Sequence, residues 1–201
     1  MKIISNFKDY YDDVAKSMSD KMVYKRDTQK YDRAQELLMA RRLGYQSIEL
    51  KPVRQILNNG SQKVVVYTDV YGHGGSGKII MDLNSAKIMY PSKLCSKFYE
   101  NNTNTFKLLQ IGTRLFRVIA KNESGNPLKM STEVKITEMG IVDNHTNFPI
   151  YSIDFVNTEN GLLACDFNHY ENLGLLGIDK IMTAQEVVEE IKNKLERLGG
   201  F

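Results

Sequence analysis

After residue 61 the sequence consists mainly of short β-branched and aromatic runs, and this pattern constrains the fold more than any other feature. Residues 64–67, Val-Val-Val-Tyr, have the composition of a buried strand. A glycine-rich loop separates them from a second apolar run at 79–81. Further strands are predicted at 94–99, 106–111, 115–120, 150–156 and 162–167, and the turn at 157–161 makes the last two a hairpin. Residues 121–132 are polar and are predicted to form a loop.

Helices are predicted at both ends of the chain. Residues 1–60 are predicted to be mostly helical, and one helix at 31–43 ends at Gly44. Its predicted apolar face is Ala34, Leu37, Leu38 and Leu43; an earlier helix has the stripe Phe7, Tyr10, Tyr11, Val14, Met18 and Met22. Thr183 and Glu186 have the spacing of a capping box. The stripe that follows, closed by Gly199 and Gly200, is Val187, Val188, Ile191, Leu195 and Leu198. We therefore predict an α+β fold in which antiparallel sheets pack with helices, with domains at 1–60 and 61–201.

Composition narrows the functional classes. The 201 residues carry a formal net charge of +3, which is too small to argue for nucleic-acid binding. The basic residues Arg33, Arg41 and Arg42 are interpreted as the solvated face of a helix. Cys95 and Cys165 fall in predicted apolar strands, and two buried, reduced thiols favour a cytoplasmic location. No apolar stretch has the length of a membrane span or a signal peptide, so no membrane association is expected.

The glycine-rich loop is a candidate anion site. Glycines at 72, 74, 75 and 77 remove side chains that would keep a phosphate from the backbone N–H groups, and Lys78 adds a positive charge. The loop is neither a Walker A motif nor a Rossmann fingerprint, because the element that follows it is predicted to be a strand. A flexible hairpin turn explains the same residues without a ligand.

The C-terminal hairpin carries a candidate metal site. Asp166 and Asn168 lie two apart on one predicted strand, so their side chains share a face, with Phe167 on the other. Asp154 lies on the partner strand. Two carboxylates and an amide oxygen are hard ligands that suit Mg²⁺. The alternative is that all three are polar, outward positions of an amphipathic hairpin.

The order of these motifs resembles the ATP-grasp fold. Residues 106–121 resemble the stretch of that family in which one basic residue precedes a glycine turn and another ends the next strand. Lys107 and Lys121 stand there, at positions that are usually arginine. Residues 152–156 and 161–168 resemble its metal-binding strands, which ribosomal-protein glutamate ligases and similar carboxylate–amine ligases show with glutamate at the position of Asp166. Residues 173–179 continue the likeness, which extends from about residue 60 to 197.

The resemblance implies a role for each candidate residue. Asp154, Asp166 and Asn168 would hold one or two Mg²⁺ ions on the phosphates of ATP. The lid over these phosphates would be Gly72, His73, Gly74, Gly75, Gly77 and Lys78, and the hinge strand that meets the adenine would be Lys97, Phe98, Tyr99 and Glu100. Lys107 and Lys121 would meet phosphate or an acyl-phosphate. The implied activity is that of a carboxylate–amine or peptide ligase, whose partners are a nucleotide and a carboxylate-bearing small molecule or peptide.

Departures from the family leave other functions open. Thr68 and Asp69 stand where the family usually has lysine and proline, and the front lobe is reduced. A catalytically degenerate ATP-grasp module that binds a protein partner is therefore an alternative. Residues 1–12 resemble the start of uncharacterised phage-encoded proteins, which implies a phage or mobile-element origin. With that origin, the alternative module would be a phage-encoded protein modulator in the host cytoplasm. Nucleic-acid binding through the basic residues of the first 60 positions predicts a steep salt dependence. His73, His145 and His169 lack the spacing of a zinc site, and the oligomeric state is left open.

Overall fold

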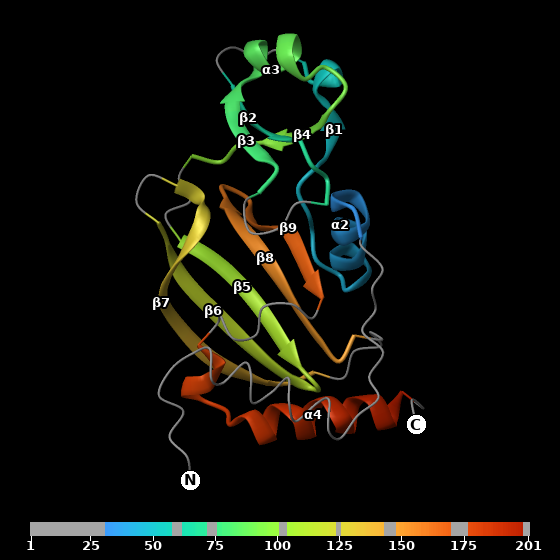
Figure 1. Ribbon diagram of the computed structural model, residues 1–201, viewed down its shortest axis with the longest axis vertical. Helices are drawn as coiled ribbons and strands as arrows, with labels where there is room; N and C mark the ends of the chain where they lie inside the picture. Colours follow the sequence, from blue (N-terminus) through green and yellow to red (C-terminus); the bar gives the residue numbers. More distant parts are fainter. Residues whose placement is uncertain are drawn as a thin grey trace.

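The computed structural model describes residues 31–57, 62–71, 76–100, 104–123, 126–142, 148–169 and 177–198. These residues form an α+β fold with two antiparallel sheets. The smaller sheet lies at one end of the molecule, the larger sheet in the middle, and the last helix at the other end (Figure 1). The helix predicted near residue 10, the loop residues 72–75 and the two glycines at 199 and 200 lie outside the described residues.

The smaller sheet has the strand order β1-β4-β2-β3. Its strands are β1 (Lys51–Pro52), β2 (Lys63–Tyr67), β3 (Lys78–Asp82) and β4 (Leu94–Lys97). The short helices η1 (Val53–Gln55) and α3 (Leu83–Met89) pack on it through a core of Val53, Val64, Val66, Leu83, Ala86 and Cys95. Strands β2, β3 and β4 were predicted, whereas α3 was not. Its start is fixed locally, because the Asp82 carboxylate accepts a hydrogen bond from the Ser85 N–H at 2.8 Å.

The larger sheet has the strand order β7-β6-β5-β8-β9. Its strands are β5 (Asn104–Ile111), β6 (Arg114–Glu123), β7 (Asn126–Ile141), β8 (Ile150–Thr158) and β9 (Gly161–His169). The predicted loop at 121–132 is wrong, because β6 continues to Glu123 and β7 begins at Asn126. β7 is an edge strand, and such a strand tolerates polar residues on its open side.

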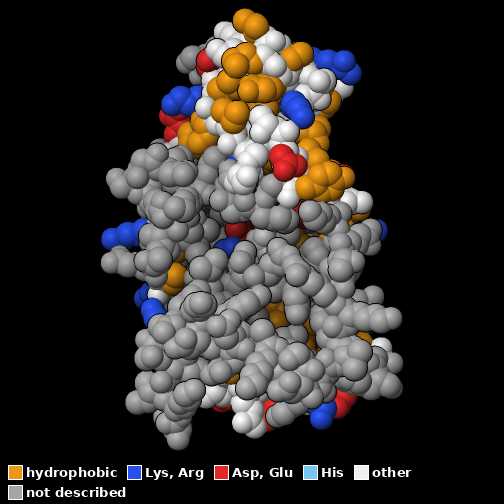
Figure 2. All heavy atoms as spheres, viewed as in Figure 1, with side chains coloured by type: hydrophobic (Ala, Val, Ile, Leu, Met, Phe, Trp, Pro, Cys, Tyr) orange, Lys and Arg blue, Asp and Glu red, His pale blue; other side chains and the backbone are white. Residues whose placement is uncertain are grey.

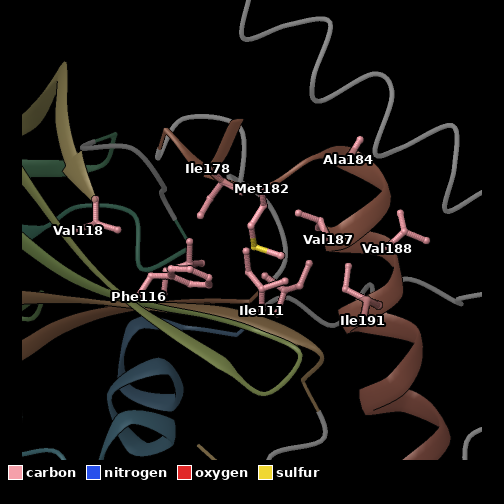
Figure 3. Packing of buried hydrophobic residues seen from close by; sticks show 11 residues of the cluster. Ile111, Phe116, Val118, Ile178, Met182, Ala184, Val187, Val188 and Ile191 are labelled. Carbon is pink, nitrogen blue, oxygen red and sulfur yellow. The ribbon is translucent and has the colours of Figure 1, made fainter. Parts of the chain in front are cut away.

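Helix α4 (Ala184–Arg197) and η3 (Ile178–Lys180) cover one face of the larger sheet. The capping box is confirmed, since the Thr183 side chain accepts from the Glu186 N–H and the Glu186 carboxylate accepts from the Thr183 N–H at 2.7 Å. Val187, Val188 and Ile191 pack against Ile111 and neighbouring residues of the sheet, with Ile178 and Met182 between them (Figure 3). Burial of these three residues anchors the helix, as its periodicity predicted, and Leu195 is half-buried. Leu198, the last residue of the predicted stripe, is exposed, so that part of the prediction is wrong.

Helix α2 (Arg33–Arg42) packs on the opposite face and against β9. Its buried face differs from the predicted one, because Ala34 and Leu38 are exposed, whereas Leu37 and Ala40 are buried. Arg33 is also buried, so the interpretation of Arg33 as part of a solvated face is wrong, although Arg41 and Arg42 are exposed. The helix ends as expected, with Gly44 in the left-handed region at φ 88°.

Candidate functional site

A row of charged residues crosses the larger sheet. Lys107 on β5 is the register partner of Asp154 on β8, and Asp154 is the partner of Asp166 on β9. Directly paired residues of an antiparallel sheet point to the same face, so these three side chains are neighbours. The predicted meeting of Asp154 and Asp166 is therefore confirmed. Asn168, the partner of Ser152, lies on the same face two residues further along β9.

This face of the sheet is divided into an apolar and a polar half. Leu109 and Ile111 follow Lys107 along β5 on the same face and belong to the core beneath α4. Phe167 points to the other face and packs in the α2 core, as predicted. The register between β8 and β9 shifts by one residue at Cys165, which forms a bulge. Asp166 pairs with Asp154, Ala164 pairs with Phe155, and Cys165 between them is skipped. The charged row thus continues the α4 face beyond its apolar core.

Two cations from other elements, Arg33 and Lys78, meet this row. The Lys107 Nζ lies 2.5 Å from Asp154 Oδ1. The Arg33 guanidinium donates through Nη1 to Asp166 Oδ1, and the Lys78 Nζ donates to Asp166 Oδ2 at 3.4 Å. Arg33 belongs to α2 and Lys78 to β3 of the smaller sheet, so the cluster joins both sheets and a helix.

Arg33 and Glu36 are the site residues that sequence reasoning missed. Both lie in the first turn of α2, both are 1% exposed, and the Arg33 Nη1 is 2.8 Å from Glu36 Oε2. Fully buried charged side chains are rare unless they are paired. The available signal was the i, i+3 pairing of opposite charges at the start of a helix, which by itself is common on surfaces.

The surroundings of Glu36, Asp154 and Asp166 shift the pKa values of these three carboxyls differently. Burial raises the pKa of Glu36 to about 9, and the charge of Asp166 adds to the rise. Burial also acts to raise the pKa of Asp166, but the charges of Lys78 and Arg33 outweigh it and hold that pKa below its usual range. Burial raises the pKa of Asp154 in spite of its lysine partner. Asp166 is therefore the carboxylate that stays most firmly ionised.

The base of the glycine-rich loop lies beside this cluster. The Gly77 carbonyl accepts hydrogen bonds from the Thr68 N–H at 2.8 Å and the Asp69 N–H at 3.2 Å, which closes the loop between β2 and β3. A side chain at Gly77 would meet Asp69 Cβ at 2.6 Å, and φ is +69°, so glycine is required here. Lys78 is the register partner of Tyr67 and reaches Asp166 from this position. Gly72, His73, Gly74 and Gly75 lie outside the described residues.

The predicted hinge segment lies where the chain passes from the smaller to the larger sheet. Lys97 ends β4, and β5 begins at Asn104. The Phe98 N–H donates to the Lys63 carbonyl at 3.1 Å, which keeps the segment beside β2. Lys97 Nζ lies 5.4 Å from the centre of the Tyr99 ring, and the exposed Glu100 carboxylate pairs with Lys63 at 3.0 Å. Lys97 and Glu100 are exposed, Phe98 and Tyr99 are half-buried, and a role of this segment toward adenine stays a prediction.

Lys121, the second predicted lysine of the site, is not brought to the cluster. It is exposed on β6 and is the register partner of Asn104. Val118 is the partner of Lys107, and Lys121 lies an odd number of residues beyond it. Its side chain therefore points to the opposite face of the sheet.

The donor set suits a hard divalent cation. Among the described residues, no group of three or more His, Cys, Asp or Glu side chains is arranged to hold a metal, so the predicted site depends on the Asn168 amide beside its two carboxylates. Asp154 Oδ1 is buried and has no partner in hydrogen-bond geometry within the described part of the chain, although Lys107 lies close to it. A buried carboxylate oxygen in that state, beside a second carboxylate, fits the coordination preferences of Mg²⁺.

Comparison with known proteins gives a fold and no sequence relative. No family model and no curated protein matches the sequence. Among solved structures, D-alanine–D-alanine ligase from Helicobacter pylori matches with a TM-score of 0.50 at 11% identity, over 83% of this chain and 61% of the ligase. The ATP-grasp ligase PsnB, complexed with a phosphomimetic precursor variant, Mg and ADP, matches with a TM-score of 0.50 at 11% identity, over 90% and 65%. The macrocyclase MdnC from Microcystis aeruginosa, bound with precursor peptide MdnA, matches with a TM-score of 0.50 at 10% identity, over 86% and 64%.

The class that these likenesses define is the ATP-grasp fold, and this chain has it. The matches cover 83–90% of this chain, and the structure has the antiparallel sheets packed with helices that the sequence predicted. The chain spans less than two thirds of the length of each of these three structures. Within the described residues, the helices are too short or too polar to cross a lipid bilayer.

Proposed function

We propose that this protein binds ATP with Mg²⁺ between its two sheets and acts as a carboxylate–amine or peptide ligase through an acyl-phosphate. The observation that carries the proposal is the contact of Lys78 with Asp166 at 3.4 Å. This contact joins the base of the glycine-rich loop to the strand that bears the metal ligands. An anion cradle and a carboxylate pair at this distance can hold the two ends of one metal–phosphate unit.

Each residue of the cluster has a task in this proposal. Asp154, Asp166 and Asn168 would hold the metal, whose positive charge would stabilise negative charge on phosphate. Lys107 and Lys78 each leave a carboxylate partner and turn to phosphate oxygens, since a lysine is a mobile point charge with three donors. Segment 97–100 supplies backbone groups to the adenine. Lys121 lies on the opposite face of the sheet and would act on a bound partner only from the exposed side.

The structural neighbours support the substrate class. PsnB is complexed with Mg, ADP and a phosphomimetic variant of its minimal precursor, and MdnC is bound with a precursor peptide. We accordingly propose a peptide or a carboxylate-bearing small molecule as the acceptor of the phosphoryl group. We propose a cytoplasmic location for this reaction, because it consumes ATP.

A non-catalytic binding module is the second candidate. Thr68 stands where the resemblance led us to expect a lysine, and its carbonyl accepts a hydrogen bond from Lys93 at 3.0 Å. The carboxylates of the cluster are already neutralised by Lys107, Arg33 and Lys78. A site satisfied in this way can keep its fold and bind a nucleotide without transferring a phosphoryl group.

Calorimetric titration with ATP, with Mg²⁺ or with EDTA, tests the site. We expect ATP to bind with Mg²⁺ present and Asn168→Ala to weaken that binding about tenfold or more, as loss of a metal-site residue does. Asn160→Ala, in the exposed turn between β8 and β9, is the matched control and should bind like the wild type. Unchanged binding by Asn168→Ala would refute the metal assignment. ADP formation in the presence of carboxylate and amine mixtures then distinguishes the ligase from the binding module.

A further inference from the structure

Arg33 is a buried cation at the junction of the two sheets. It is the first residue of α2, where the Asp32 side chain accepts a hydrogen bond from the Gln35 N–H at 2.9 Å. The backbone N–H of Arg33 donates to the Val70 carbonyl at 3.1 Å. The start of α2 is therefore fixed beside the segment that follows β2, and Arg33 has a defined position relative to the smaller sheet.

The Arg33 side chain contacts both sheets. Its guanidinium donates to Asp166 on β9 of the larger sheet. The guanidinium carbon lies 5.6 Å from the centre of the Tyr67 ring on β2 of the smaller sheet. The Tyr67 hydroxyl is in turn 3.3 Å from Ser96 Oγ on β4, the strand that leads into the predicted hinge. One side chain thus relates the metal-ligand strand to the strands around the hinge.

The two oxygens of Asp166 have partners of different kinds. Oδ1 is held by Arg33, which is 1% exposed and keeps its charge at every accessible pH. Oδ2 is met by Lys78 at 3.4 Å, and the Lys78 side chain is 14% exposed. Lysine is a flexible, strongly hydrated cation that exchanges partners readily. Oδ1 therefore has a fixed partner and Oδ2 an exchangeable one.

We propose, building on the function proposed above, that Arg33 is a positioning residue for the metal site. It holds Oδ1 of Asp166 permanently, so that Oδ2 alone is exchanged between Lys78 and a divalent cation. Residues that hold a ligating carboxylate in place affect metal affinity without touching the metal. The role requires arginine, because a planar guanidinium can bond a carboxylate edge-on and stack on an aromatic ring at the same time. Lysine keeps the charge but cannot make both contacts.

The test compares two dissociation constants in the same variant. The probe is the non-hydrolysable ATP analogue AMP-PNP, titrated by calorimetry once with Mg²⁺ and once with EDTA. We expect Arg33→Lys to raise the dissociation constant with Mg²⁺ about tenfold or more, and to change the constant in EDTA by less than about twofold. Arg41→Lys is the matched control, because it makes the same change on an exposed part of α2, where Arg41 bonds Ser47 Oγ at 2.6 Å. It should behave like the wild type in both titrations.

The outcomes distinguish this inference from the proposed function. If Arg33→Lys raises both dissociation constants equally, or changes neither, Arg33 has a structural role only. The inference is then wrong, while the nucleotide site stands. If the wild type binds AMP-PNP in neither condition, the proposed function fails and the inference fails with it. Should Arg33→Lys not fold, Tyr67→Leu removes the ring on which the guanidinium stacks and leaves Arg33 and Asp166 in place. It must lower the Mg²⁺-dependent affinity in the same selective way.

Discussion

Replacing Asp166 by asparagine should lower the free energy of unfolding far more than the loss of one surface charge would. The substitution preserves the size of the side chain and removes the charge that faces Arg33 and Lys78. Asp166 is 6% exposed and Arg33 is 1% exposed, so solvent cannot replace the lost partner. Removing one partner of a buried ion pair typically costs about 3–5 kcal/mol, because the other charge stays buried. We expect the lower part of this range, since Glu36 remains 2.8 Å from Arg33.

The chain contains its own control for this prediction. Arg114 and Glu138 form a two-pronged pair at 2.8 and 2.7 Å, and the Glu138 side chain is 42% exposed. Breaking an exposed pair costs about 1 kcal/mol or less, so Glu138→Gln should be nearly neutral. The free energy of unfolding is measured by urea titration followed by far-UV circular dichroism. A loss below about 1 kcal/mol for Asp166→Asn would refute the reasoning, because it would mean that the pair is hydrated.

The remaining predictions concern elements outside the site. Gly112→Ala should lower the free energy of unfolding by about 2–4 kcal/mol, because φ is +59° and the new Cβ would lie 2.4 Å from the Glu190 carbonyl oxygen. Gly44→Ala, at φ +88° with nothing within 4 Å of the new Cβ, should lower it by only about 1 kcal/mol in the same urea titration. Burial raises the pKa of the Cys95 thiol to about 11, so the unfolded chain loses this proton first, and the free energy of unfolding falls as pH rises from about 9 to 11. Cys95→Ala should reduce this pH dependence of the free energy of unfolding across the same range. Thr183→Ala removes the α4 cap and should lower the free energy of unfolding by about 1 kcal/mol, whereas an effect near zero would contradict the capping role.

The sequence was informative wherever the deciding interactions are local. The α4 boundary follows from residues three apart, Thr183 and Glu186, and the meeting of Asp154 with Asp166 follows from a hairpin whose turn joins adjacent strands. Strand periodicity then decides which residues share a face. The likeness of motif order to a known fold gave the two-sheet architecture.

The sequence was uninformative where the deciding partner is distant. Arg33 and Asp166 are 133 residues apart, so nothing near Arg33 indicates that the position is buried. Rules of apolar periodicity place charged residues outside, and they therefore assigned Ala34 and Leu38 to the buried face of α2. β7 was missed for a related reason. It is an edge strand in which Val134 and Ile136 pack toward α4 while Lys135 is exposed, and its polar positions have the composition of a loop.

Neither a local pattern nor a distant partner explains the hydrophobic side chains at the smaller-sheet end of the molecule. They gather there at the surface (Figure 2), and the exposed ones include Ile79, Ile88 and Met89. The functional account depends instead on the charged cluster between the sheets.

The most direct test is to find where a bound divalent ion sits. Mn²⁺ replaces Mg²⁺ with AMP-PNP on ¹⁵N-labelled protein, and paramagnetic broadening of the amide signals is recorded. Our account predicts that the signals of Asp154, Asp166, Asn168 and Lys78 broaden together, because the two strands and the base of the glycine-rich loop surround one ion. Broadening confined to other surfaces, or broadening of Asp154 and Asp166 with Lys78 unaffected, would contradict it.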